Sequence, residues 1–516
     1  MKFKSLLRAI GIALTITSTS SMAEVSVSLD TDNTGAVINK NIYGQFMEHL
    51  GRGIYEGVWV GPESDIPNTN GYRDDVLQAL KDLQVPLLRW PGGCFADEYH
   101  WEDGIGPNAE RKRTVNTTWG GVIDDNSFGT HEFMNLAEML GADAYVNGNL
   151  GTGSPKEMAQ WVEYMTSDSE SSLANLRREN GRDKPWRLHF FAIGNETWGC
   201  GGSMDADYYV DLYKHYATFI KTPANNKPTL IASGGTDFRT DYTEALMSME
   251  SYWSYNKGAI SHHYYTLPTS DWSKKGSALN FPESEWASTM SRTLKIEDIL
   301  KTNIEIMDKY DPDEEIGFYL DEWGTWYDVT EGDPGFLYQQ NSLRDAVVAA
   351  LNLNIYHKYA KRVQMTIIAQ MVNVLQAMIL TDKEKMLLTP TYHVFRMHIP
   401  FQDATYVPIE LDGNETYGQG EHQVPKINAS AARGKDGKLW ITLVNVDPNN
   451  DEVINLGSAY KRITGEILTA ETMDAHNTFK DPNAVRPTSF EVSPAENGEL
   501  VITLPPKAII VAQLTE

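Results

Sequence analysis

Short apolar runs that end abruptly in glycine or charged residues recur along much of the chain. The run 188–193 is followed closely by Glu196, and the run 316–320 is followed closely by Glu322. Short runs rich in aliphatic and aromatic residues are typical of strands buried on both faces. Because a buried strand has no place for a carboxylate along its length, we expect both glutamates at the carboxyl ends of their strands, where loops open to solvent.

Eight such runs alternate with amphipathic helical patterns. The apolar runs are residues 42–46, 86–89, 144–146, 188–193, 229–232, 259–261, 316–320 and 365–369. The helical patterns include residues 73–83, 131–140, 154–165, 206–220, 297–310 and 342–359. This alternation predicts an α/β fold, a (β/α)₈ TIM barrel. A doubly wound open sheet also alternates, but no glycine-rich phosphate motif follows the first strand, which weakens that alternative.

The pattern changes after about residue 385. Half-buried alternation and Asn-, Gly- and Pro-rich turns replace the helices, which predicts an antiparallel, jelly-roll-like β-sandwich. Strands are expected at residues 438–446, 453–456, 464–468, 490–492, 500–504 and 508–514. The predicted division is a barrel at 41–385 and a C-terminal sandwich at 386–516, which N-terminal strands at 24–40 join.

The first residues have the pattern of a signal peptide. Lys2, Lys4 and Arg8 precede an apolar stretch at 9–16, and small residues lead to a cleavage site after Ala23. The apolar stretch is too short to span a membrane, and no later segment is apolar enough. The sequence therefore predicts a signal peptide at 1–23 and a secreted or periplasmic protein.

Composition narrows the class of partner. The 516 residues carry a net charge of −26, which argues against nucleic acid or an anionic membrane as a partner. With only two cysteines, Cys94 and Cys200, the chain can form at most one disulfide. The histidine pair His262-His263 lacks a further ligand motif, so we expect neither a metal nor a cofactor.

Two carboxyl groups at one end of a barrel suit hydrolysis of a glycosidic bond. Retaining enzymes hold the two groups about 5–5.5 Å apart, and inverting enzymes about 6.5–9.5 Å apart. Asn195 stands where it can contact a sugar 2-hydroxyl, and Trp198 offers an apolar wall that would raise the pKa of Glu196. A single Asn-Glu or Asp-Glu pair is more often a solvated loop, but two pairs at the ends of buried barrel strands favour catalysis.

Several motifs together make the resemblance specific. They are residues 44–49, 51–55, 89–93, 99–107, 194–196, 263–265, 321–323 and 369–373. On these residues the sequence resembles glycoside hydrolase family 51, the retaining α-L-arabinofuranosidases, over nearly the whole mature chain. The family fold, a (β/α)₈ barrel with a β-sandwich, agrees with the pattern above.

The resemblance implies that Glu196 is the acid/base and Glu322 the nucleophile. It also implies a set of substrate contacts: Glu48 with ring hydroxyls, Arg89 beside the nucleophile, Asn195 with the 2-hydroxyl, Tyr265 near the nucleophile, His263 and Gln370 in the pocket, and Trp101 and Trp326 as aromatic walls. Without the resemblance, Trp101 and Trp326 fit the core equally well.

The chain departs from the family pattern at Cys94, where many members carry an asparagine that contacts the sugar. Cys94 remains a candidate substrate contact. Because Cys94 and Cys200 follow the second and fourth strands on one face of the barrel, we hypothesise a disulfide beside the pocket. Two independent buried thiols are the alternative.

The predicted function is an exo-acting α-L-arabinofuranosidase that releases terminal arabinofuranose from arabinoxylan, arabinan or their oligosaccharides with retention. The alternatives are an endo-β-1,4-glucanase or xylanase on the same scaffold and a non-catalytic sugar-binding protein. Loops 91–129 and 266–291 are expected to shape the leaving-group sites. Family analogy implies an oligomer, commonly a hexamer.

Overall fold

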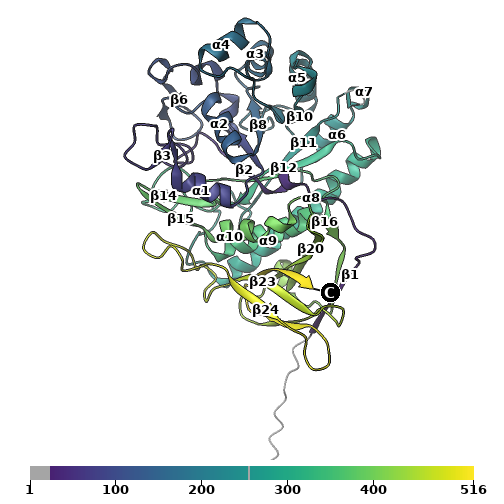
Figure 1. Cartoon of the computed structure of the whole chain (residues 1–516). Helices are drawn as coiled ribbons and strands as arrows, with labels where there is room; N and C mark the ends of the chain where they lie inside the picture. The colour runs from purple at the N-terminus through teal and green to yellow at the C-terminus, as the bar shows by residue number, and fades with distance from the viewer. Residues whose placement is uncertain (1–23, 254–255, 516) are drawn as a thin grey trace, which may run out of the picture.

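Eight parallel strands close into a barrel in the computed structural model, which describes residues 24–253 and 256–515 (Figure 1). The strands are β2 (Gly44–Phe46), β5 (Leu87–Trp90), β8 (Asp143–Gly148), β9 (Phe190–Ile193), β10 (Thr229–Ala232), β11 (Ala259–Thr266), β12 (Gly317–Thr325) and β13 (Thr366–Ile368). Each of the eight predicted runs contributes one strand, which confirms the predicted barrel. The predicted signal peptide, 1–23, lies outside the described residues.

Strands β11 and β12 are longer than predicted and change register. The pairing of β11 with β12 shifts between Ser261 and His263, and the pairing of β12 with β13 shifts between Leu320 and Trp323. The expected strand end at Leu320 is therefore wrong, and Glu322 lies inside β12, directly opposite His263. Such irregularities re-aim side chains, and apolar periodicity alone does not reveal them.

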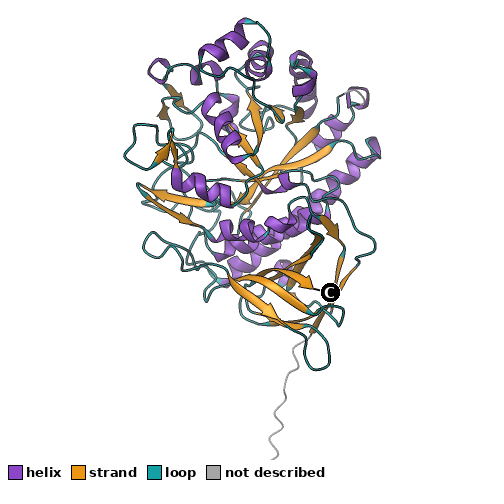
Figure 2. Cartoon of the chain, viewed as in Figure 1, coloured by secondary structure: helices purple, strands orange, loops and turns teal. Residues whose placement is uncertain are grey.

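Helices cover the outside of the barrel (Figure 2). They are α1 (Asp74–Asp82), α2 (Thr130–Leu140), α3 (Pro155–Thr166), α4 (Ser172–Glu179), α5 (Ala206–Phe219), α6 (Asp241–Met247), α7 (Glu250–Trp253), α8 (Glu283–Tyr310), α9 (Leu343–Lys358) and α10 (Pro390–Met397). The Ser154 side chain caps α3 by accepting from the Glu157 amide at 3.2 Å. Of the helices in the described ranges, none has both the length and the apolar character needed to cross a membrane.

Two sheets form the β-sandwich. One, in spatial order, is β17 (Ile409–Asp412), β1 (Glu24–Leu29), β22 (Glu452–Asn455) and β25 (Val501–Leu504). The other is β16 (Thr405–Val407), β20 (Ile427–Arg433), β21 (Leu439–Asn445), β26 (Ile509–Thr515), β23 (Arg462–Leu468) and β24 (Thr488–Val492). Neighbours pair antiparallel except β1 with β22, which is parallel. Where the chain divides into domains stays a prediction.

Helix α9 lies between the barrel and the sandwich (Figure 1). Its residues are buried from Leu343 to His357, as expected for a helix covered on all sides. His357 joins the two parts, because one ring nitrogen lies 2.7 Å from the Tyr43 hydroxyl and the other 3.0 Å from the Ser430 hydroxyl on β20. Burial lowers the pKa of His357 well below its ordinary value, so the ring is neutral and can accept one bond while donating the other.

Replacing His357 by alanine should lower thermal stability. The change leaves a cavity and removes the partner of two buried hydroxyls, a cost of about 2–4 kcal/mol, which lowers Tm by at least about 2 °C in a chain of this size. Differential scanning calorimetry measures the shift. The matched control is His215→Ala on α5, where the side chain is exposed. Equal Tm values for the two variants would contradict the joining role of His357.

Candidate active site

A small cavity of about 170 Å³ opens at the carboxyl end of the barrel. Seven predicted site residues line it: Glu48, Cys94, Glu196, Tyr265, Glu322, Trp326 and Gln370. The remaining lining residues are Leu50, Trp119, Trp198, Thr236, Trp272, Leu337 and Leu375. Roughly 300–1,000 Å³ is typical of pockets for drug-sized ligands, so this cavity suits a single sugar ring.

Glu322 is held by two donors. Arg89 donates from Nη1 to one carboxylate oxygen at 3.0 Å, and the Tyr265 hydroxyl donates to the other at 2.8 Å. A donor on each oxygen fixes the plane of the carboxylate, and the guanidinium places a positive charge beside it. The arrangement suits a group that must remain negatively charged and keep one orientation.

Arg89 ties three strands together beneath the cavity. It donates to the Asp321 carbonyl at 2.9 Å and to the Asn195 side-chain oxygen at 2.6 Å, and its guanidinium lies 4.6 Å from the centre of the Phe46 ring. The Asn195 amide nitrogen, by contrast, is buried with no partner in the part of the chain that the structure describes. Asn195 therefore keeps one free donor, which can serve a sugar hydroxyl.

Glu196 lies at the tip of the loop after β9, opposite Glu322. One oxygen of each of the two carboxylates lies within 4.8 Å of the other. Burial raises the pKa of Glu196, and the negative charge of Glu322 adds to the rise although His263 and Arg89 oppose it. The site thus contains one glutamate biased toward the protonated form beside one paired with a guanidinium.

His263 bridges the acidic groups from β11. Its Nδ1 lies 2.8 Å from Glu196 and 3.6 Å from Glu322, and its Nε2 lies 3.3 Å from Asp321. Burial would lower the pKa of His263, but the three surrounding carboxyl groups outweigh burial and raise it to about 10. The ring is therefore an imidazolium at neutral pH, with a hydrogen on both nitrogens, and Nδ1 donates to Glu196.

Asp321 is a buried aspartate of the site for which the sequence predicted no role of its own. Its carboxylate accepts from the Tyr145 hydroxyl at 2.6 Å and lies 3.9 Å from the Arg89 Nε. Burial opposes ionisation, yet Arg89 and His263 together lower the pKa of Asp321. Asp321 thus supplies a fixed negative charge that holds the two cations in place.

Glu48 accepts four hydrogen bonds at the wall of the cavity. The donors are the Gly93 amide (3.0 Å), the Phe95 amide (3.1 Å), the Trp119 indole (2.9 Å) and the Gln370 amide (3.0 Å). Burial raises the pKa of Glu48 to about 7. Glu48 can therefore exchange hydrogen bonds with a sugar hydroxyl as either acceptor or donor near neutral pH.

The Gly92-Gly93 pair lets the backbone approach both walls of the cavity. A Cβ at Gly92 would lie 2.6 Å from Glu48 Cγ, and one at Gly93 would lie 3.0 Å from Glu322 Oε2. Both distances are too short for a side chain without displacing an acidic group. This close approach explains why the chain needs two glycines after β5.

The aromatic wall differs from the predicted one. Trp101 is not at the cavity: it is 1% exposed and donates to the Glu157 carbonyl at 3.2 Å in the core. Trp119 takes the wall position and donates to Glu48. It lies in the turn between β6 (Thr114–Asn116) and β7 (Val122–Asp124), inside the loop 91–129 that was expected to shape the site.

Asp97 is a further residue of the site that was not predicted from the sequence. It accepts from the Asn195 amide at 2.9 Å and from the Leu150 amide at 2.7 Å, so it joins the loops after β8 and β9. Burial raises its pKa to about 7. Only its place just after Cys94, close to the Pro-Gly-Gly motif, could have signalled this role.

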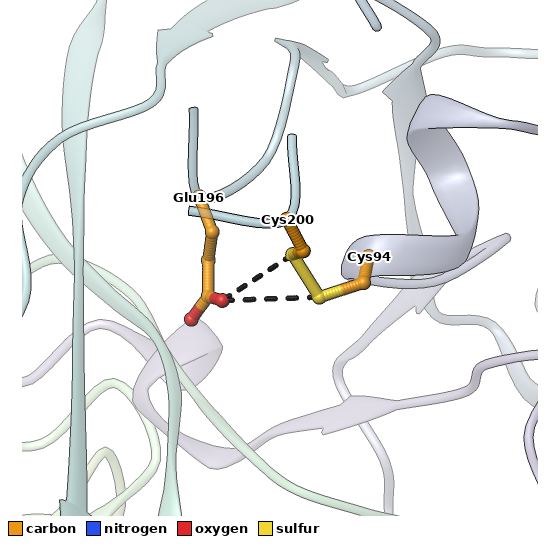
Figure 3. A group of neighbouring side chains, drawn as sticks. All are labelled: Cys94, Glu196 and Cys200. Atoms are coloured by element: carbon orange, nitrogen blue, oxygen red, sulfur yellow. Dashed lines mark hydrogen bonds between the residues drawn. A yellow bond between two sulfur atoms is a disulfide. The ribbon is translucent and has the colours of Figure 1, made fainter. Parts of the chain in front are cut away.

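Cys94 and Cys200 form a disulfide at the edge of the cavity, which confirms the hypothesis of a bridge (Figure 3). Among the described residues, two groups of three side chains are close enough to share an ion: Cys94, Glu196 and Cys200, and Glu196, His263 and Glu322. Disulfide sulfurs are not thiolates, and an imidazolium has no free nitrogen lone pair, so neither donor set fits a metal.

Comparison with known proteins places this site in context. The chain is 50% identical over 519 residues to the "Intracellular exo-alpha-L-arabinofuranosidase" of Bacteroides ovatus, covering 100% of both chains. The prediction of a secreted or periplasmic protein is therefore wrong, because this full-length relative is named intracellular. The crystal structure of the GH51 arabinofuranosidase from Xanthomonas axonopodis pv. citri is 48% identical, with a TM-score of 0.92 over 96% of this chain and 100% of that one.

A second solved structure and two family models agree with these matches. The α-L-arabinofuranosidase from Thermotoga maritima, solved as an arabinose complex, is 28% identical with a TM-score of 0.80, over 96% of this chain and 100% of that one. The model "Alpha-L-arabinofuranosidase 1 domain" matches residues 79–278, and "Alpha-L-arabinofuranosidase C-terminal domain" matches residues 321–508. The chain belongs to glycoside hydrolase family 51, the α-L-arabinofuranosidases.

Proposed function

We propose that the protein is a retaining exo-α-L-arabinofuranosidase that uses Glu322 as nucleophile and Glu196 as acid/base. The observation that carries the proposal is the pair of facing carboxylates, one oxygen of each within 4.8 Å of the other, at the wall of a cavity of about 170 Å³. That separation supports direct attack by a carboxylate, since inverting enzymes need about 6.5–9.5 Å to admit a water. The family names the substrate class, arabinose-containing glycans.

In the first step, Glu322 attacks the anomeric carbon while Glu196 donates its proton to the glycosidic oxygen. The bond to the leaving sugar breaks, and a covalent arabinosyl–Glu322 ester remains. Arg89 and Tyr265 hold the attacking carboxylate in line, because each donates to one of its oxygens. Asn195 offers its free amide to the 2-hydroxyl as positive charge develops on the ring.

In the second step, Glu196 acts as a base. It removes a proton from water, which attacks the anomeric carbon from the face that the leaving group vacated and releases Glu322. Two inversions give net retention. His263, an imidazolium in contact with both carboxyl groups, offsets the negative charge that Glu196 gains in the first step.

The cavity favours exo action over the endo alternative. Trp119, Trp326, Leu337 and Leu375 wall in a space sized for one ring, whereas a polymer chain needs a cleft open at both ends. The non-catalytic alternative leaves the pairing of a guanidinium-bound carboxylate with a protonation-biased one unexplained. The preferred polymer and a hexameric assembly stay predictions from the sequence.

Glu322→Gln should abolish turnover. A carboxamide keeps the size of the side chain but cannot form the ester, so kcat/KM for 4-nitrophenyl α-L-arabinofuranoside should fall at least about a thousandfold. Initial-rate kinetics measure the loss. Glu496→Gln, on the exposed surface of the sandwich, is the control and should match the wild type. Residual activity above one tenth of the wild type would contradict the nucleophile role.

Glu196→Ala should separate substrates by leaving group. A dinitrophenolate leaves without protonation, so kcat/KM for the 2,4-dinitrophenyl glycoside should stay within about tenfold of the wild-type value. For the methyl glycoside, kcat/KM should fall at least about a hundredfold. Azide should raise the turnover of the dinitrophenyl substrate and give an arabinosyl azide, because it needs no base. Equal losses on both substrates would exclude the acid/base role.

The stereochemistry and the mode of attack can be read from early products. Proton NMR of the first turnovers should show α-arabinofuranose before mutarotation, as two inversions require. Linear arabinan should release arabinose as the sole sugar from the earliest time points. Initial β-arabinofuranose would contradict retention, and early oligosaccharides would favour the endo alternative.

A further inference from the structure

The disulfide joins the loop that carries the acid/base to the loop after β5. Cys94 begins a short 3₁₀ helix (Cys94–Asp97) after β5, and Cys200 lies in the turn after β9, close behind Glu196. Figure 3 shows the Glu196 side chain alongside the bridge. Its Oε2 atom lies 3.5 Å from the Cys200 sulfur and 3.8 Å from the Cys94 sulfur.

Only one protonation state of Glu196 gains a hydrogen bond from this contact. The other carboxyl oxygen, Oε1, accepts from His263 at 2.8 Å, so the acidic proton belongs on Oε2. Disulfide sulfurs carry no hydrogen and act only as weak acceptors. A protonated Oε2 can therefore donate to the bridge, whereas an ionised Oε2 faces two sulfur atoms that offer it no donor.

The remaining charged neighbours of Glu196 come from other strands. His263 on β11 and Arg89 on β5 favour the ionised form, and Glu322 on β12 favours the protonated form. Asp237, in the loop after β10, is a further acidic group whose charge interacts with that of Glu196. His263, Arg89 and Glu322 come from barrel strands, whereas Asp237 and the disulfide belong to the loops.

We propose that the Cys94–Cys200 disulfide is a positioning group for Glu196, which fixes the carboxyl at the cavity and accepts a hydrogen bond from the protonated carboxyl in the resting enzyme. Reduction of the bridge then weakens proton donation to the leaving group while the nucleophile stays in place. The inference rests on the proposed role of Glu196 and adds to it a dependence on the redox state of two cysteines outside the carboxylate pair.

The reduction has a simple chemical balance. A water-soluble phosphine attacks one sulfur, the S–S bond breaks, and water supplies oxygen to the phosphine oxide and protons to the two thiols. Cys200 is exposed, so the reagent can reach the bridge. Each thiol is mainly protonated at pH 7 and can donate S–H to Oε2, which stabilises the carboxylate and so lowers the pKa of Glu196. Glu196 then loses its acidic proton at a lower pH than in the oxidised enzyme.

The test compares two leaving groups before and after reduction of the folded enzyme. With phosphine, kcat/KM for methyl α-L-arabinofuranoside at pH 7 should fall about threefold to tenfold, and the basic limb of its pH profile should move down by about 0.5–1 pH unit. The dinitrophenyl glycoside should change less than about twofold, because its leaving group needs no proton. Removing phosphine and adding oxidised glutathione should restore kcat/KM for the methyl glycoside to its value before reduction.

A matched variant separates the bridge from side effects of the reagent. Cys94→Ser/Cys200→Ser carries hydroxyl donors in place of the thiols, so it should resemble the reduced wild type and should not respond to phosphine. Thiol titration must find two thiols after reduction, and near-UV circular dichroism reports whether the fold is kept. Full reduction without a change in either substrate, or with equal losses on both, overturns the proposal. Lack of activity in the oxidised enzyme would instead overturn the proposed function.

Discussion

A buried guanidinium is the constraint on which the rest of the site depends. Arg89 is 1% exposed and ties the ends of β5, β9 and β12 together through Asn195 and the Asp321–Glu322 pair. A cation without partners in the core would be very unfavourable, so acidic groups must converge on it. The placement of Asp321 and Glu322 thus follows from the need to pair one positive charge inside the barrel.

The same constraint shapes the electrostatics of the acids. Arg89 and His263 supply two positive charges, and Asp321 and Glu322 lie close to both; the two cations lower the pKa of Asp321. Burial is the largest influence on Glu196 and raises its pKa, and the charge of Glu322 adds to the rise, although His263 and Arg89 oppose it. Two glutamates of one chemical type therefore lie in different environments, one with its pKa raised by burial and one bonded to a guanidinium, and such a difference suits acid/base and nucleophile roles.

Much of this could be predicted from the sequence, because it depends on local pattern. The apolar runs predicted every barrel strand, and the acidic residues that follow Gly194 and Leu320 predicted the end of the barrel at which the cavity opens. The register shifts of β11 and β12 could not be predicted, since they depend on how neighbouring strands pair, and after the first shift His263 lies opposite Glu322. Trp101 and Trp119 both lie in the segment 91–129, and tertiary packing decides which of them reaches the pocket. The export prediction was wrong because composition at 1–23 resembles a signal without fixing a location.

The loops, together with the barrel strands, form the surroundings of the acid/base Glu196. The strands supply Glu196 with an imidazolium and a guanidinium, both of which favour the carboxylate, and with the charge of Glu322, which opposes them. Burial also opposes ionisation, and on the side that faces the loops the described neighbours are a disulfide without hydrogens and a wall of aromatic and aliphatic side chains. Proton donation therefore depends on how closely the loops after β5 and β9 are held against the glutamate.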